Sequence, residues 1–347
     1  MPHRLLRWLP AVVAPVLVAG VVTVPLVAAA AAPPDLPAKS AQQVLELVAK
    51  AGSIEGFTGR VQQTSDLGLP SIPSTGAGTD SETGSALDLV TGTHTATVEV
   101  AGASKTRIAV LDPSAERDLI RDGRSVWLWN SKANTATHLV ATGTAAPEEQ
   151  ATTTTPAELA QELLAKVDDS TTVTVDTAQQ VADRDAYTLV LTPNTDTTTI
   201  GSVRIAVDAV TGLPLDVQVL ARGASTPAFE TGFTQLSYAV PAASRFAFTP
   251  PSDAKVTTKT LDASDRPHAG QTGAKPAISG SGWASVVTVP SSAVPSDLAT
   301  NATVQRLTTA ADGGRVLHTA LVNVLLTADG RVLAGAVPVS SLESAAG

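Results

Sequence analysis

Residues 201–252 read GSVRIAVDAVTGLPLDVQVLARGASTPAFETGFTQLSYAVPAASRFAFTPPS. Asp208–Gly212 has the composition of a turn, and it separates two runs in which apolar and polar side chains alternate. Alternation of this kind is the pattern of a half-buried strand. It predicts strands at 201–207, 214–220 and 228–238, and we predict a last short strand at Phe246–Phe248. Consecutive strands joined by short turns favour an antiparallel sheet.

The same alternation extends through the N-terminal side of this block. Arg117–Arg121 and Ser125–Trp129 flank Asp122 and Gly123, which together give a strong hairpin signal. Further strand patterns lie at 57–63, 95–100, 105–111, 134–140, 172–175 and 185–191. Many short strands and few helical patterns predict a mainly β (α+β) fold with a large antiparallel sheet.

Two helices are indicated by their capping residues. Ser40, followed by Gln43, forms a capping box, and the helix is expected to end at Gly52. Thr155 is an N-cap candidate with proline at the first helical position. The predicted apolar stripe of this second helix is Leu159, Leu163 and Leu164.

Composition divides the chain into four parts. We expect a signal segment at 1–32, a main domain at 38–257, a flexible linker at 258–282 and a small α+β extension at 283–347. The main domain includes two segments expected to be loops, 66–87 and 141–155. Within the extension we expect a strand at 284–289, a weak helix at 296–307 and a hairpin of 316–327 with 332–337. The pattern leaves open whether this extension lengthens the main sheet or forms its own unit.

The N-terminus has the layout of a secretory signal. Arg4 and Arg7 precede an apolar run, and an alanine run at 28–32 precedes Pro33. The alternative is an uncleaved membrane anchor, because the apolar run approaches 20 residues. Both interpretations place the rest of the chain outside the cytoplasm, either secreted or held at the outer face of the plasma membrane.

Charge and residue usage exclude several classes of function. The net charge of −9 argues against nucleic acid, which requires clustered lysine and arginine. The chain has no cysteine, which excludes disulfides, thiolate metal sites and a cysteine nucleophile. No two histidines have the spacing of metal ligands, and no catalytic motif is found. We therefore expect no catalytic residues, no metal, no cofactor and no enzymatic activity.

The strand series resembles the LolA/LolB-type lipoprotein carriers and the related N-terminal domain of RseB. The resemblance is carried by 201–252, above all its Phe246-Ala-Phe-Thr-Pro-Pro251 ending, by 122–129, and by the first helix with Phe57–Gln63. It covers about residues 38–255. The expected loop at 66–87 and the C-terminal extension lie outside the shared pattern and resemble the actinobacterial branch of this group. The resemblance implies a half-open barrel, in which a curved antiparallel sheet wraps around a few helices and binds acyl chains on its concave face. The arginine that the carriers use near their cavity has no clear counterpart here.

Aromatic and apolar side chains of these strands are the candidates for the cavity lining. Trp127 and Trp129 are two residues apart and share one face of a strand. Core packing is the alternative role for these side chains. The candidate ligand-binding residues are Phe57, Val61, Trp127, Trp129, Phe229 and Phe233. Aspartate in place of Val217 or Leu128 is expected to abolish lipid uptake while partly sparing the fold.

Three functions are consistent with the sequence. The first is an extracytoplasmic carrier or holder of lipid or lipoprotein acyl chains. The second is an RseB-like envelope sensor that binds a membrane protein such as an anti-sigma factor. RseB-like sensors have a sizeable second domain, whereas only about 65 residues follow the expected linker here. The third is a structural envelope protein with a filled core.

Overall fold

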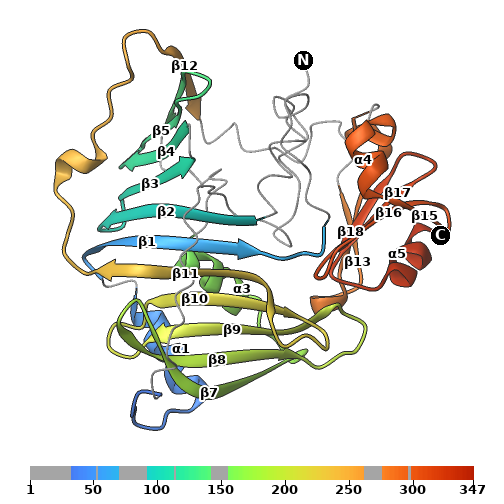
Figure 1. Ribbon diagram of the computed structural model, residues 1–347, viewed down its shortest axis with the longest axis horizontal. Helices are drawn as coiled ribbons and strands as arrows, with labels where there is room; N and C mark the ends of the chain where they lie inside the picture. Colours follow the sequence, from blue (N-terminus) through green and yellow to red (C-terminus); the bar gives the residue numbers. More distant parts are fainter. Residues whose placement is uncertain are drawn as a thin grey trace.

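The computed structural model describes residues 33–51, 54–69, 92–112, 115–141, 155–261, 276–295 and 298–347. Two sheets account for most of this part of the chain (Figure 1). The main sheet is large, curved and not closed, in agreement with a half-open barrel. Its twelve described strands follow the order β12-β6-β5-β4-β3-β2-β1-β11-β10-β9-β8-β7. The predicted mainly β fold class is confirmed.

The strands of the main sheet lie close to the predicted positions. They are β1 (Gly56–Ser65), β2 (Gly92–Ala101), β3 (Lys105–Asp112), β4 (Ala115–Asp122), β5 (Ser125–Asn130), β6 (Thr135–Ala141), β7 (Thr171–Val181), β8 (Arg184–Pro193), β9 (Ile200–Asp208), β10 (Pro214–Ala221), β11 (Pro227–Ser237) and β12 (Lys255–Leu261). Neighbours pair antiparallel except β12, which runs parallel to β6. The predicted β4–β5 hairpin is present, with Asp122 opposite Ser125 and Gly123 at a φ of 62°.

Helices α1 (Ala41–Lys50) and α3 (Pro156–Leu164) begin where the capping residues predict. Ser40 and Gln43 form one capping box, and Thr155 and Glu158 form the other. The buried face of α3 differs from the predicted leucine stripe. Pro156, Ala157 and Ala160 are its buried residues, whereas the three leucines are only partly buried. Small residues allow α3 to approach the strands closely, and this brings Ala160 against the sheet.

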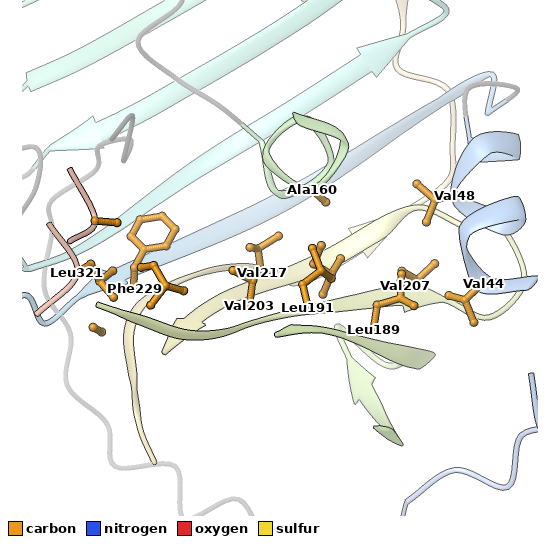
Figure 2. Close-up of a cluster of buried hydrophobic side chains, with 14 of the residues drawn as sticks. Val44, Val48, Ala160, Leu189, Leu191, Val203, Val207, Val217, Phe229 and Leu321 are labelled. Atoms are coloured by element: carbon orange, nitrogen blue, oxygen red, sulfur yellow. The ribbon is translucent and has the colours of Figure 1, made fainter. Parts of the chain in front are cut away.

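Both helices pack on the same face of the sheet. Ala160 of α3 and Val44 and Val48 of α1 point toward the apolar side chains of β8 to β11, including Val217 and Leu189 (Figure 2). We call the face that carries Val217 the inner face, and the opposite face the outer face. Strand register extends this definition across the sheet, because paired residues point to the same side.

The segment predicted as a strand at Phe246–Phe248 is a turn of 3-10 helix, η2 (Ala243–Phe246), followed by irregular chain. The strand prediction is therefore wrong. The reason is topological: β11 lies in the middle of the sheet and β12 at its edge, with six strands between them. We call residues 239–254, which make this crossing, the strap. A segment that crosses over other strands cannot pair within the sheet. After this crossing the chain enters β12, which runs parallel to β6.

The C-terminal residues form a sheet of their own, which answers the question that the sequence left open. Its order is β13-β14-β18-β17-β16-β15, and Leu325, Leu333 and Leu342 are among its own core residues. The strands are β13 (Ala277–Ser279), β14 (Val286–Val289), β15 (Thr309–Ala311), β16 (Gly314–His318), β17 (Asn323–Thr327) and β18 (Val332–Gly335). The helices are α4 (Ala302–Leu307) and α5 (Val339–Ala346), with single turns at η4 (Gly282–Ala284), η5 (Ser291–Ala293) and η6 (Leu298–Thr300).

Two expectations for this region change. The run at 316–327 is two strands rather than one, because the Thr319 hydroxyl donates to Val322 O (2.6 Å) and accepts from Val322 N (2.9 Å), closing a tight turn. The predicted linker at 258–282 also has strand residues at both ends, since β12 extends to Leu261 and β13 begins at Ala277. Lys255, Thr257 and Lys259 follow one another along one face of β12, and pairing with β6 satisfies one side of its backbone.

The two sheets contact each other directly. Leu321 and Ala336 belong to the apolar cluster of the main sheet. Thr199 N donates to Ala336 O (2.9 Å), and Trp283 Nε1 donates to the Thr171 hydroxyl (2.8 Å). The predicted signal segment, most of the predicted loops at 66–87 and 141–155, and Gly52 lie outside the described residues. In the described part of the chain, no helix has the length and apolarity needed to cross a membrane.

Candidate functional site

The candidate site is the inner face of β1 to β6. Register places apolar side chains opposite one another across these strands: Val98 with Ile108, Ile108 with Leu119, and Leu119 with Leu128. Ile108, Leu119 and Val126 are buried in one cluster, and Leu128 and Leu139 pack against it while only partly buried. A row of side chains on one face therefore forms an apolar surface that reaches from the centre of the sheet toward its β12 edge.

The central end of this surface is closed by two phenylalanines. The Phe57 and Phe233 rings meet edge to face, with centroids 5.8 Å apart. Phe233 also lies directly over Gly59, where an added Cβ would be 2.5 Å from the ring. Val61 pairs with Phe233 and belongs to the same cluster. Glycine at position 59 lets the Phe233 ring lie flat against the strand.

Phe229 lies on the same inner face but in the other cluster. It pairs with Ser65 on β1 and packs with the core beneath α1 and α3. Between Phe229 and Phe233, the buried polar side chains of Thr231, Gln63 and His94 lie in register across β11, β1 and β2. This polar row crosses the inner face between Phe229 and the Phe57–Phe233 pair.

Trp127 and Trp129 lie on the outer face, opposite to Leu128. Trp127 pairs with Ile120 and Trp129 with Asp118, both outer-face residues. The Trp127 ring stacks on His138 with centroids 4.1 Å apart, and Phe248 of the strap lies 5.4 Å from Trp127 and 5.9 Å from Trp129. The structure thus brings Phe57, Val61, Phe229 and Phe233 to one face and places the two tryptophans on the other.

The outer face of β2 to β5 is closed by the strap and by ion pairs. Arg245 Nε donates to the Glu99 carboxylate (2.7 Å), while Arg107 forms an ion pair with Asp118. Phe246 is buried, with Lys105 Nζ 6.0 Å from its ring centroid. Burial raises the pKa of Asp118 to about 6, against the attraction of Arg107. Hydrogen bonding to Glu99 raises the pKa of Arg245 further above its usual value.

A second polar network fixes the turn between β9 and β10. The buried Asp208 carboxylate accepts from Val210 N (2.9 Å), Thr211 N (2.8 Å) and Arg184 Nε (2.8 Å). Burial opposes ionisation, but these donors outweigh it and hold the pKa of Asp208 below its usual value. Tyr238 also donates to Asp208 (3.1 Å), which ties the end of β11 to this turn. The network holds the turn and the end of β11 together.

The inner-face residues that the sequence analysis missed are Ile108, Leu119, Val126 and Leu139, whereas Leu128 was already proposed as a wall residue. The β4–β5 hairpin, which the sequence predicts, could have identified them through its register. Once a two-residue turn pairs Asp122 with Ser125, Leu119 must face Leu128, and the tryptophans must face the other way. No cluster of three metal-binding side chains occurs among the described residues.

Comparison with known proteins agrees with this fold. Residues 91–249 match the family model described as outer membrane lipoprotein carrier protein LolA. The match begins at β2 and ends in the strap just beyond Phe248, so it includes the apolar surface of β2 to β6. It leaves out β1, with Phe57 and Val61, as well as the second sheet. Among curated proteins, none matches the chain.

The chain also matches several solved structures at low sequence identity and with TM-scores below 0.5. MucB in complex with MucA(peri) is 17% identical, covers 87% of this chain and 96% of its own, and has a TM-score of 0.44. The Pseudomonas aeruginosa MucA/MucB complex is 18% identical over 88% of this chain and 96% of its own, with a TM-score of 0.41. A LolA superfamily protein from Nitrosomonas europaea is 13% identical over 61% of this chain and 99% of its own, with a TM-score of 0.25.

Proposed function

We propose that the protein is a non-enzymatic, extracytoplasmic holder or carrier of lipid or lipoprotein acyl chains. The observation that carries the proposal is the apolar inner face of β1 to β6, of which β2 to β6 lie within the region that matches a lipoprotein carrier family. Leu128 and Leu139 lie on this face and are only partly buried. An acyl chain laid over them would remove apolar surface from water on both partners, at about 0.8 kcal/mol for each buried methylene.

The signal-like N-terminus supports the extracytoplasmic location. Its arginines, apolar run and alanine run are those of an exported chain, although 1–32 lie outside the described residues. No catalytic role is proposed, because the polar networks described above stabilise turns and the strap. The proposed ligand needs no cofactor or metal.

Two adjacent residues of β6 provide the test. Leu139 points to the inner face, where it pairs with Val126, whereas Val140 points to the outer face and pairs with Ser125. Both side chains are partly buried. Aspartate at either position costs similar stability, but only Leu139→Asp places a charge on the proposed acyl surface.

The measurement is binding of a fluorescent fatty acid and a fluorescent lipopeptide to the purified, delipidated protein. Leu139→Asp is expected to weaken binding at least tenfold, which corresponds to about 1.4 kcal/mol. Val140→Asp is expected to leave it within a factor of two. Absence of saturable binding in the unmodified protein, or equal loss in both variants, would contradict the acyl-binding function.

A sensor that binds a membrane protein, such as an anti-sigma factor, is the second candidate. The specific observation in its favour is the second sheet, which has its own core and gives the chain the second unit that RseB-like sensors have. Co-purification of one membrane protein with the full chain, lost when acyl ligand is added, would favour this function. A carrier would retain acyl ligand with no such partner.

A further inference from the structure

Charged side chains are sorted between the two faces of β2 to β6 and β12. Among the side chains that the structure describes on these strands, every aspartate and glutamate points to the outer face. They are Glu99, Glu116, Asp118 and Asp122. The inner face of the same strands carries four cationic side chains, which we call the cation frame: Arg117, Arg121, Lys255 and Lys259. This sorting stands out in a chain of net charge −9.

The cation frame surrounds the apolar surface at its β12 end. Arg121, Val126, Leu139 and Lys259 lie in register across β4, β5, β6 and β12. Arg117 and Lys255 lie four residues farther along their strands, in the row of Asn130 and Thr135. At about 3.4 Å per residue and about 4.8 Å per strand, the frame is a square of roughly 14 Å on each side.

The row that passes through the middle of this square is graded in polarity. It runs from Thr257 on β12 and Thr137 on β6 to Leu128 and Leu119, and then to Ile108 and the centre of the sheet. From β5 to β1 it spans four strand spacings, roughly 19 Å. A lipid tail is about 15 Å long, half of the hydrocarbon thickness of a bilayer. The apolar part of the row is therefore at least as long as an extended tail, and the polar part lies at the edge strand.

We propose that the ligand is an anionic phospholipid, bound with its phosphate between Lys255 and Lys259 and its tails over Leu128 and Leu119. This inference rests on the acyl-binding function proposed above and adds the class of headgroup. The two lysines carry it, since both are exposed and neither forms an ion pair within the described residues. Arg117 and Arg121 add positive potential to the same end, whatever else they contact. A neutral lipid would leave Lys255 and Lys259 without an anionic counterpart.

The arrangement also sets the orientation of the ligand. Polar threonines and lysines at the β12 edge place the headgroup near water, where exposed charges interact favourably with a phosphate at low salt. Phe57 and Phe233 close the opposite end, so the tails point toward the centre of the sheet. The outer face does not suit this role, because its cations Lys105, Arg107 and Arg245 each pair with a carboxylate.

The test compares two lipids with identical tails, phosphatidylglycerol and phosphatidylcholine, in binding to the purified, delipidated protein. Phosphatidylglycerol is expected to bind about tenfold more tightly at low ionic strength, with the preference reduced in high salt. The double variant Lys255→Gln/Lys259→Gln should lose the preference while keeping its affinity for phosphatidylcholine. The control, Lys132→Gln/Lys166→Gln, removes the same charge from exposed positions outside the cation frame and should retain the preference.

The possible failures are distinct. Equal affinity for both lipids in the unmodified protein would overturn the headgroup inference and leave acyl binding intact. No binding of either lipid would overturn the proposed function itself. Competition by glycerol phosphate or by an acidic peptide, each at the affinity of the whole lipid, would show a plain anion or peptide site and would also overturn the inference.

Discussion

The two halves of the main sheet are closed on opposite sides. In the β8–β10 half, α1 and α3 cover the inner face, and Val217 is fully buried there. In the β3–β6 half, the strap and its ion pairs cover the outer face, and inner-face Leu128 remains partly buried. The same alternating sequence pattern thus builds a filled core in one half and an apolar surface in the other. The difference between the two halves lies in what covers each face, rather than in the strands themselves.

The difference in burial between the two halves can be tested by placing the same charge on the inner face of each half. Val217→Asp buries a carboxylate against α3 and should lower the free energy of unfolding by at least ~4 kcal/mol. Leu128→Asp should cost about 1–2 kcal/mol, because its side chain keeps access to water. The sequence-based expectation that Val217→Asp partly spares the fold is therefore revised. Urea denaturation measures both, and equal losses would show that the two halves are filled alike.

The strap can be tested through its two phenylalanines. Phe246 is 2% exposed, so Phe246→Ala should cost about 3 kcal/mol of unfolding free energy. Phe248→Ala, at a partly buried position over the tryptophans, should cost about half as much. Thermal and urea unfolding would give both values. If Phe246→Ala cost no more than Phe248→Ala, the outer face would not depend on the strap for its closure.

Local signals predicted the elements of the fold well. The capping boxes at Ser40 and Thr155 and the hairpin at Gly123 depend on neighbours within four residues, and each is confirmed. The register of the hairpin also determines that Trp127 and Leu128 point to opposite faces of the sheet. Trp127 and Trp129 share one face, as their spacing predicts, but their pairing with Ile120 and Asp118 makes that face the outer one.

Long-range features could not be predicted in the same way. Phe246 and Phe248 have the alternation of a strand, but their positions are set by a crossing over six strands that local pattern does not encode. The parallel pairing of β12 follows from the same crossing. The cation frame depends on register between β4 and β12, more than 130 residues apart in the chain. Only the assembled sheet brings those side chains to one face.

The buried acids of the two halves are expected to affect the free energy of unfolding differently as the pH changes. Asp216, on the β10 side, is buried near Glu230, and burial with this like charge raises its pKa from 3.8 to about 8. Between these values the folded protein holds a proton that the unfolded chain releases. Stability therefore falls as pH rises from about 4 to about 8 and is constant above that range.

Replacing Asp216 by Asn removes this loss. Relative to the unmodified protein, Asp216→Asn should gain roughly 2 kcal/mol of unfolding free energy between pH 5 and pH 7. Asp118→Asn should instead be destabilising at pH 7, because Arg107 would lose its nearest carboxylate partner and keep only the more distant Glu116. Urea unfolding at both pH values, with Asp196→Asn at an exposed position as the control, measures the difference. A pH-independent effect of Asp216→Asn would mean that its carboxyl is ionised in the folded protein, and that the outer face of the β8–β10 half is open to water.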